Sequence, residues 1–193
     1  MKKTVLILLL FGLASSWCHG DDNAASQRRI VWNRANTLLS HPYYTSATLQ
    51  QSGIGKNLRF TFVADKKRLL WAMALIKISP PLSSGWTAVQ ISYRARIPAG
   101  MQLCCAWEEN DEVTYEKKWR NGSNGAFTTI TIPLSQFAVS SWSRRNDKNS
   151  RLDLSQIRTV LIGAVGEWDG SGDKRGEIEI GNLVLQQELP LRR

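Results

Sequence analysis

The stretch WTAVQISYRARI, residues 86–97, decides the fold class. Its apolar and polar side chains alternate, with Val89, Ile91, Tyr93, Ala95 and Ile97 on one side and Gln90, Ser92, Arg94 and Arg96 on the other. Successive side chains of a β-strand point to opposite faces, so this alternation predicts a strand with one face in a core and one face outward.

Seven more strand-like runs follow or precede it, one of which, 68–78, is apolar on both faces, so that periodicity alone leaves a helix there as an alternative. They are NLRFTFVA (57–64), RLLWAMALIKI (68–78), MQLCCAW (101–107), EVTYEKKW (112–119), FTTITIPL (127–134), RTVLIGAV (158–165) and GEIEIGNLVL (176–185). Gly, Pro, Asn and Ser separate them, as expected of turns. The set predicts an all-β fold, a two-sheet antiparallel β-sandwich of jelly-roll type. The last two runs are expected to pair as its final hairpin.

The chain divides into four parts. Residues 1–20 carry two lysines, an apolar run from Val5 to Leu13, and then small and polar residues. That order is typical of a secretory signal peptide and is too short to span a bilayer, so the protein is expected to be secreted or periplasmic. Cys18 leaves lipidation as an alternative. Residues 21–57 are expected to hold the first weak elements of the fold, 58–187 the β-sandwich core and 188–193 a C-terminal tail.

The net charge of the chain indicates which classes of partner it could bind. The formal net charge of +9 becomes +7 without Lys2 and Lys3. This balance suits an anionic partner, although a merely soluble basic protein remains an alternative. The basic residues are dispersed and no nucleic-acid-reading motif is present, so no nucleic acid is expected.

Cys104 and Cys105 are adjacent and a bridge between them would be strained, so no disulfide is expected. Cys105 should be buried, and Cys104 should point outward.

Four segments in order carry a family resemblance: GWTAVQISYRARI (85–97), FTTITIPLSQF (127–137), LDLSQIRTVLIGA (152–164) and GEIEIGNLVL (176–185). Together they resemble a galactose-binding-domain-like jelly roll, near family 11 carbohydrate-binding modules and the domain of the complex I intermediate-associated protein. The resemblance covers about residues 58–187. It implies non-catalytic glycan binding on a concave face or a loop rim. Many relatives carry a structural calcium, but Gly181 stands where they often have an aspartate.

Aromatic and basic side chains supply the candidate ligand contacts. Indole rings stack on the apolar C–H faces of sugars, while polar groups bind the hydroxyls. Trp119 and Trp168 border turns and are the stacking candidates, with Tyr115 a weaker one. Arg94 and Arg96 lie about 7 Å apart on one face of their strand. With Gln102 they could bind carboxylates or hydroxyls, or they could simply face solvent.

Metal and catalytic signals are weak. Asp169, Ser171 and Asp173 alternate like the start of a calcium loop, but Lys174 and Ile180 break the pattern. A solvated turn is therefore preferred, with Asp169 and Asp173 as weak metal candidates and no cofactor expected. The acidic cluster Glu108, Glu109, Asp111 and Glu112 lies in one turn, where a charged hairpin is a simpler explanation than a catalytic carboxylate pair.

These observations lead to one main hypothesis and two alternatives. The main hypothesis is an exported, non-catalytic carbohydrate-binding domain for an oligo- or polysaccharide, with an acidic glycan among the candidates. The first alternative is an envelope structural or assembly protein that binds a protein partner through the same sandwich. The second is a small glycoside hydrolase or lyase. No membrane span is expected after the signal peptide.

Overall fold

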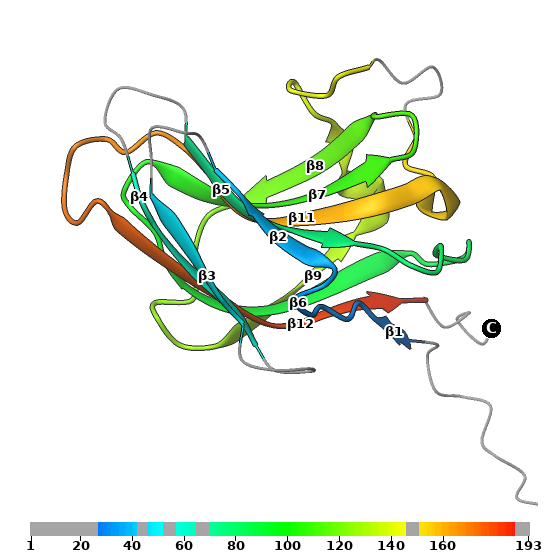
Figure 1. Cartoon of the computed structure of the whole chain (residues 1–193), viewed down its shortest axis with the longest axis horizontal. Coiled ribbons are helices and arrows are strands. Elements are labelled where there is room, and N and C mark those ends of the chain that lie inside the picture. Colours follow the sequence, from blue (N-terminus) through cyan, green and yellow to red (C-terminus); the bar gives the residue numbers. More distant parts are fainter. Residues whose placement is uncertain (1–26, 42–45, 52–56, 65–69, 146–150, 188–193) are drawn as a thin grey trace, which may run out of the picture.

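Two six-stranded antiparallel sheets lie face to face, with the hydrophobic core between them (Figure 1). This computed structural model describes residues 27–41, 46–51, 57–64, 70–145 and 151–187. The predicted signal peptide and the tail at 188–193 lie outside these ranges. The predicted all-β sandwich is confirmed. Within the described ranges no helix is long and apolar enough to cross a membrane.

Sheet A has the order β3-β4-β12-β6-β9, and β1 pairs with the end of β12. Its strands are β1 (Gln27–Arg29), β3 (Ala47–Gln51), β4 (Leu58–Val63), β6 (Ala88–Arg96), β9 (Thr128–Pro133) and β12 (Arg175–Gln186). The stretch that decided the fold class is thus β6, which pairs with β12 on one side and β9 on the other.

Sheet B has the order β10-β8-β7-β11-β5-β2. Its strands are β2 (Thr37–Ser40), β5 (Leu70–Lys77), β7 (Met101–Glu109), β8 (Thr114–Trp119), β10 (Ala138–Val139) and β11 (Ile157–Gly166). Two 3-10 turns, η1 (Leu134–Gln136) and η2 (Leu154–Gln156), complete the described elements. All eight strand-like runs contain a strand of one sheet or the other, including 68–78, where the structure has β5 and not a helix.

The inward side chains of both sheets meet in one core. Val89, Ile91 and Tyr93 of β6 are at most 1% exposed, as the alternation predicts. From sheet B, Trp107 is fully buried and meets Phe137 edge to face at 6.2 Å. Burial of this apolar surface is the main driving force for bringing the sheets together.

The predicted final hairpin is wrong. β11 lies in sheet B between β7 and β5, whereas β12 lies in sheet A between β6 and β4. The segment at 167–174 therefore crosses from one sheet to the other at one end of the sandwich (Figure 1). Alternation reports which residues form a strand but carries no information about which strand becomes its partner, so consecutive runs were mistaken for neighbours.

The residues NRANTLL (33–39) form a tight turn that leads into β2. The Asn33 side chain accepts hydrogen bonds from the backbone N–H groups of Ala35 and Asn36, at 2.8 and 3.1 Å. Asn side chains commonly close such turns on their own backbone. The strand then begins at Thr37 and pairs with β5.

Candidate functional site

The sequence-predicted ligand residues do not form one site, because they are distributed over both outer faces and the core. Arg94 and Arg96 lie on the outer face of sheet A, and Gln102 lies on the outer face of sheet B. Tyr115 is 0% exposed and packs in the core opposite Trp107. It cannot contact a ligand there, because its register on β8 turns it inward.

Trp119 and Trp168 are packing residues more than open stacking surfaces. Both are partly buried against the core. The Trp119 indole N–H donates to the Tyr93 hydroxyl at 3.2 Å, and the two rings meet at 6.0 Å. The Trp168 indole N–H donates to the carbonyl of Ser171 at 2.6 Å and so closes the segment that joins β11 to β12.

The tryptophans with large exposed surfaces are Trp71 and Trp142, at 39% and 42%. Sequence reasoning missed both. Trp71 belongs to the run 68–78, which is apolar on both faces, so its alternation did not reveal which residues point outward. Trp142 belongs to the polar connection that also contains Phe137. Phe137 is buried at 7%, but Trp142 is not.

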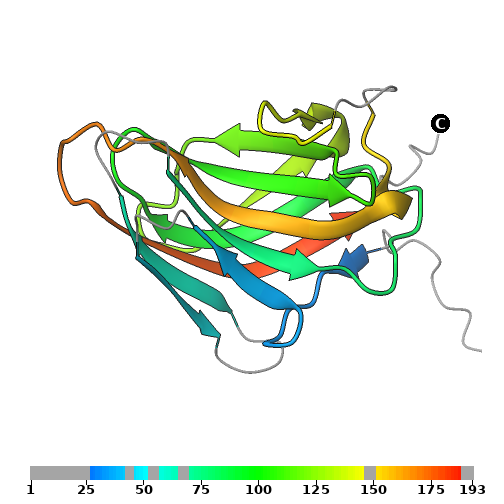
Figure 2. The same ribbon diagram turned by 45° about the horizontal axis from the view of Figure 1, so that its top comes forward.

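Trp71 lies on the outer face of sheet B, and the Trp142 indole reaches the same face, where it contacts Glu116 of β8. Figure 2 shows the strands of this sheet. We call this face the platform. It is built from the outward residues of four adjacent strands: Trp71, Met73 and Leu75 of β5, Val165, Gly163 and Leu161 of β11, Gln102, Cys104 and Ala106 of β7, and Lys118 and Glu116 of β8.

The floor of the platform is apolar and closely covered. Met73, Cys104, Ala106, Leu161 and Val165 form a hydrophobic cluster separate from the core, each at most 9% exposed. Cys104 and Cys105 are both free thiols on opposite faces of β7, so the expected absence of a bridge is confirmed. Burial raises the pKa of both thiols, which keeps them neutral.

Glu116 is the polar centre at one side of the platform. Its carboxylate accepts the Trp142 indole N–H at 2.9 Å and pairs with the Lys118 ammonium at 2.9 Å. The Cys104 thiol donates to the same carboxylate at 3.7 Å. Trp142 is thereby held against β8, although it comes from the connection that follows β10.

At the other side, three residues form one row across the sheet. Val165 of β11 is directly opposite Trp71 on β5 and directly opposite Gln102 on β7. The Trp71 indole N–H donates to the Ser40 hydroxyl at 3.1 Å, which fixes the ring. The exposed Gln102 amide has no hydrogen-bond partner among the described residues. Two strand spacings separate Trp71 from Gln102, about 10 Å.

The outer face of sheet A is instead a network of ion pairs. Arg94 donates to Glu179 at 2.6 and 2.8 Å, and its guanidinium lies 5.2 Å from the centre of the Phe127 ring. Asn57 donates to the other oxygen of Glu179. Burial alone would raise the pKa of Glu179, but the hydrogen bonds from Asn57 and Arg94 lower it below its usual range. Arg94 is therefore engaged in a structural pair.

The weak metal candidates do not fit a calcium site. One oxygen of Asp169 accepts from the backbone N–H and the hydroxyl of Ser171, and one oxygen of Asp173 accepts from the Arg175 N–H. Each carboxylate thus closes its own turn. In the portion of the chain that is described, no three His, Cys, Asp or Glu side chains cluster as metal ligands. At Gly181 a side chain would meet the Phe127 ring at 3.1 Å.

The acidic cluster at 108–112 supports the local structure. Glu108 pairs with Arg158 at 2.8 Å, and this hydrogen bond raises the pKa of the Arg158 guanidinium. Glu109 is 6% exposed and accepts from the backbone N–H of Asp153 at 2.6 Å. Glu112 adopts a positive φ of 72° in the tight turn before β8. These contacts explain the carboxylates without a catalytic role.

Comparison with known proteins places the fold. No protein-family model and no curated protein matches the chain. Among solved structures, the chain is similar to the family 11 carbohydrate-binding module of the cellulosomal cellulase Lic26A-Cel5E of Clostridium thermocellum. The TM-score is 0.62 at 12% identity over 88% of this chain and 98% of that one.

Two further structures share the arrangement. The family 11 module from Clostridium thermocellum in complex with a β-1,3-1,4-mixed-linked tetrasaccharide has a TM-score of 0.60 at 13% identity, over 86% of this chain and 98% of that one. An exo-β-agarase matches with a TM-score of 0.50 at 12% identity, over 82% of this chain and 24% of the enzyme. The predicted resemblance to family 11 modules is confirmed at the level of the fold. The resemblance to the complex I intermediate-associated domain stays a prediction.

Proposed function

We propose that the protein is an exported, non-catalytic carbohydrate-binding domain and that its platform binds an oligosaccharide. The row Trp71–Val165–Gln102 carries this proposal. An exposed, fixed indole offers a face for the C–H groups of a sugar ring, and a free amide offers both a donor and an acceptor for its hydroxyls. The apolar floor between these two side chains is nearly buried and carries no protruding polar group, so a sugar ring can lie flat on it.

The size of the platform favours a short chain of sugars. Trp71 on β5 and Glu116 on β8 lie three strand spacings apart, about 14 Å across the sheet. This exceeds the width of one sugar ring. The likeness to family 11 modules, one of them bound to a mixed-linked tetrasaccharide, supports the same class of ligand.

The charges of the platform favour a neutral sugar. Lys118 is paired with Glu116, and the neighbouring Arg158 is paired with Glu108. The net charge suggested an acidic glycan, but the two cations in these pairs are already bound to carboxylates and are not free to bind one. We therefore assign a neutral oligosaccharide to the platform.

Calorimetric titration of the mature domain with the mixed-linked β-1,3-1,4 tetrasaccharide and a panel of neutral oligosaccharides tests the proposal. Trp71→Ala and Gln102→Ala should each weaken binding; we expect at least tenfold for Trp71→Ala, which corresponds to about 1.4 kcal/mol. Phe127→Ala is the matched control, since Phe127 is a comparably exposed aromatic that directly precedes β9 of the other sheet. Wild-type affinity in both platform variants would contradict the proposal.

A protein partner is the second candidate, because Leu38 continues the exposed apolar surface beside Leu75. Leu38 is 58% exposed and lies directly opposite Leu75 on β5. Exposed apolar patches often mark protein contacts. Loss of partner capture in Leu38→Ser, without any oligosaccharide binding by the wild type, would favour this second function.

Export rests on the order of residues at the N-terminus. A protein recovered from the periplasm or medium should lack about the first 20 residues, as intact-mass measurement would show. Added acyl mass on Cys18 would instead support lipidation.

A further inference from the structure

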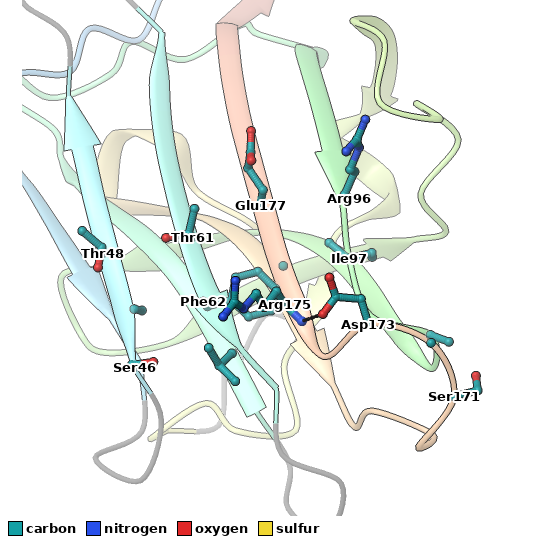
Figure 3. Close-up of a pocket in the computed structure, with 15 residues that line it drawn as sticks. Ser46, Thr48, Thr61, Phe62, Arg96, Ile97, Ser171, Asp173, Arg175 and Glu177 are labelled. Carbon is teal, nitrogen blue, oxygen red and sulfur yellow. Dashed lines mark hydrogen bonds between the residues drawn. The ribbon is translucent and has the colours of Figure 1, made fainter.

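A polar pocket lies on sheet A, at the end where the chain crosses from β11 to β12 (Figure 3). It has a volume of about 660 Å³. Its central row crosses four strands of sheet A: Arg96 is directly opposite Glu177, Glu177 is opposite Thr61, and Thr61 is opposite Thr48. Ser46, Ser171, Asp173 and Arg175 complete its polar lining.

The arginines of this face divide into two kinds. Strands β4, β6 and β12 carry four of them. Arg59 pairs with Glu177 at 2.9 Å and Arg94 pairs with Glu179 at 2.6 Å. Neither Arg96 nor Arg175 has a carboxylate or hydrogen-bond acceptor for its guanidinium within the described ranges. Both unpaired guanidinium groups line the pocket.

Register makes these two arginines diagonal neighbours on the sheet, and their guanidinium groups point to different parts of the pocket (Figure 3). Arg96 is opposite Glu177, and Arg175 precedes Glu177 by two residues on the same face of β12. The two arginines are therefore diagonal neighbours, about 7–8 Å apart at the backbone. Arg96 also lies against the turn after β8, where a side chain at Gly125 would meet its Nε at 3.3 Å. Glu177 is already bound to Arg59 on its other side.

Hydroxyl groups surround the unpaired charges. The hydroxyls of Ser46, Thr48 and Thr61 form no hydrogen bond with other described residues. One oxygen of Asp173 accepts the Arg175 backbone N–H, which holds the crossing segment at the pocket edge. The pocket thus offers two cationic donors and three hydroxyls beside the carboxylates of Glu177 and Asp173, in a volume that suits a small polar molecule.

We infer that this pocket binds the anionic group of an acidic saccharide, through Arg96 and Arg175, as a site separate from the platform. Guanidinium groups bind carboxylate and sulfate oxygens by charge-assisted hydrogen bonds, often in pairs. The threonine and serine hydroxyls would meet the hydroxyls of the same sugar. The sequence suggested Arg94 as the partner of Arg96, but the structure commits Arg94 to Glu179 and brings Arg175 into its place.

Titration calorimetry with three probes tests the inference: a galacturonate trisaccharide, a sulfated galactose oligosaccharide and the neutral galactose oligosaccharide. The first two provide a carboxylate and a sulfate. Binding of either acidic probe that is weakened in the pocket variants, but kept in Trp71→Ala, supports the site and identifies the anionic group; any binding of the neutral probe should be unaffected by the pocket variants. Arg96→Gln and Arg175→Gln should each reduce affinity about tenfold or more. Affinity of the wild type should also fall with added salt, and less steeply in either variant.

Arg34→Gln is the matched control, because it removes one exposed charge in the turn before β2, away from the pocket. An equal loss in Arg34→Gln would show non-specific attraction and overturn the inference. Unchanged affinity in both pocket variants, or no binding of either acidic probe, would overturn it as well. If a glutamine variant fails to fold, Arg96→Lys and Arg175→Lys keep the charge and should retain partial binding. If Trp71→Ala weakened binding of the acidic probe and the two pocket variants did not, the acidic ligand would be assigned to the platform and the inference would be overturned.

Discussion

At the scale of single residues, Glu179 shows how one carboxylate fixes three strands. It accepts from Asn57, just before β4, and from Arg94 of β6, while it belongs to β12. It is 8% exposed, whereas the side chain of Arg94 is 42% exposed. Alternation predicted correctly that Arg94 points outward. It could not supply the partner, which lies 85 residues away along the chain.

Glu179→Gln should destabilise the fold in a pH-dependent way. Because the pKa of Glu179 is lowered on folding, its contribution is present above the unfolded pKa of about 4.3 and is lost as the pH falls through the folded pKa. At pH 7 we expect a loss of about 1–2 kcal/mol, discounted for the exposure of Arg94. The gap to wild type should narrow below about pH 4.

Thermal melts between pH 7 and pH 3 measure this gap. Glu177→Gln is the control, because its pair with Arg59 is more exposed, at 38% and 44%, and should change stability less. A gap that stays constant over the whole pH range would show that Glu179 acts through packing and not through its charge.

At the scale of elements, Gly163 sets how closely β11 approaches β5. A Cβ atom at this position would meet the backbone oxygen of Ala72 at 2.0 Å. Backbone of a neighbouring strand cannot yield as a flexible side chain can. Gly163 also lies at the centre of the platform, opposite both Met73 and Cys104.

Gly163→Ala should therefore be destabilising, by about 3 kcal/mol or more, since the two strands must separate to admit a methyl group. The control is Gly122→Ala, where a Cβ atom would meet nothing within 4 Å. Chemical denaturation of both variants measures the difference. Equal stability of the two variants would mean that β5 and β11 shift apart without cost.

The strands themselves could be predicted from sequence, but their neighbours could not. Period-two alternation is local, and β6 shows it from Val89 to Arg96. Partner choice depends on contacts far apart in the chain, which is why β11 and β12 were taken for a hairpin. β5 adds a second difficulty: its apolar residues occupy both faces, so the exposure of Trp71 could not be foreseen.

At the scale of the whole molecule, the sandwich keeps two kinds of surface apart. The platform faces outward from sheet B and carries exposed indoles over a neutral floor. The pocket faces outward from sheet A and carries two unpaired arginines. Two packed sheets are about 10 Å apart, and the core fills the space between them. Predicted site residues that are close in the sequence thus lie on opposite faces, because β6 belongs to sheet A and β7, the next strand along the chain, belongs to sheet B.

This separation predicts that a neutral oligosaccharide and an acidic saccharide bind independently. Each ligand stabilises the folded state in proportion to RT ln(1 + [L]/Kd), about 2.7 kcal/mol at one hundred times its Kd. Both ligands together should give the sum, roughly 5 kcal/mol, and the Kd of each should be unchanged when the other is saturating. Differential scanning calorimetry and paired titrations measure the two quantities. If the two ligands compete, the stabilisation by both together will be no larger than the greater of the two single values. That result would show that both ligands bind the same face, and either the platform or the pocket would then not be a binding site.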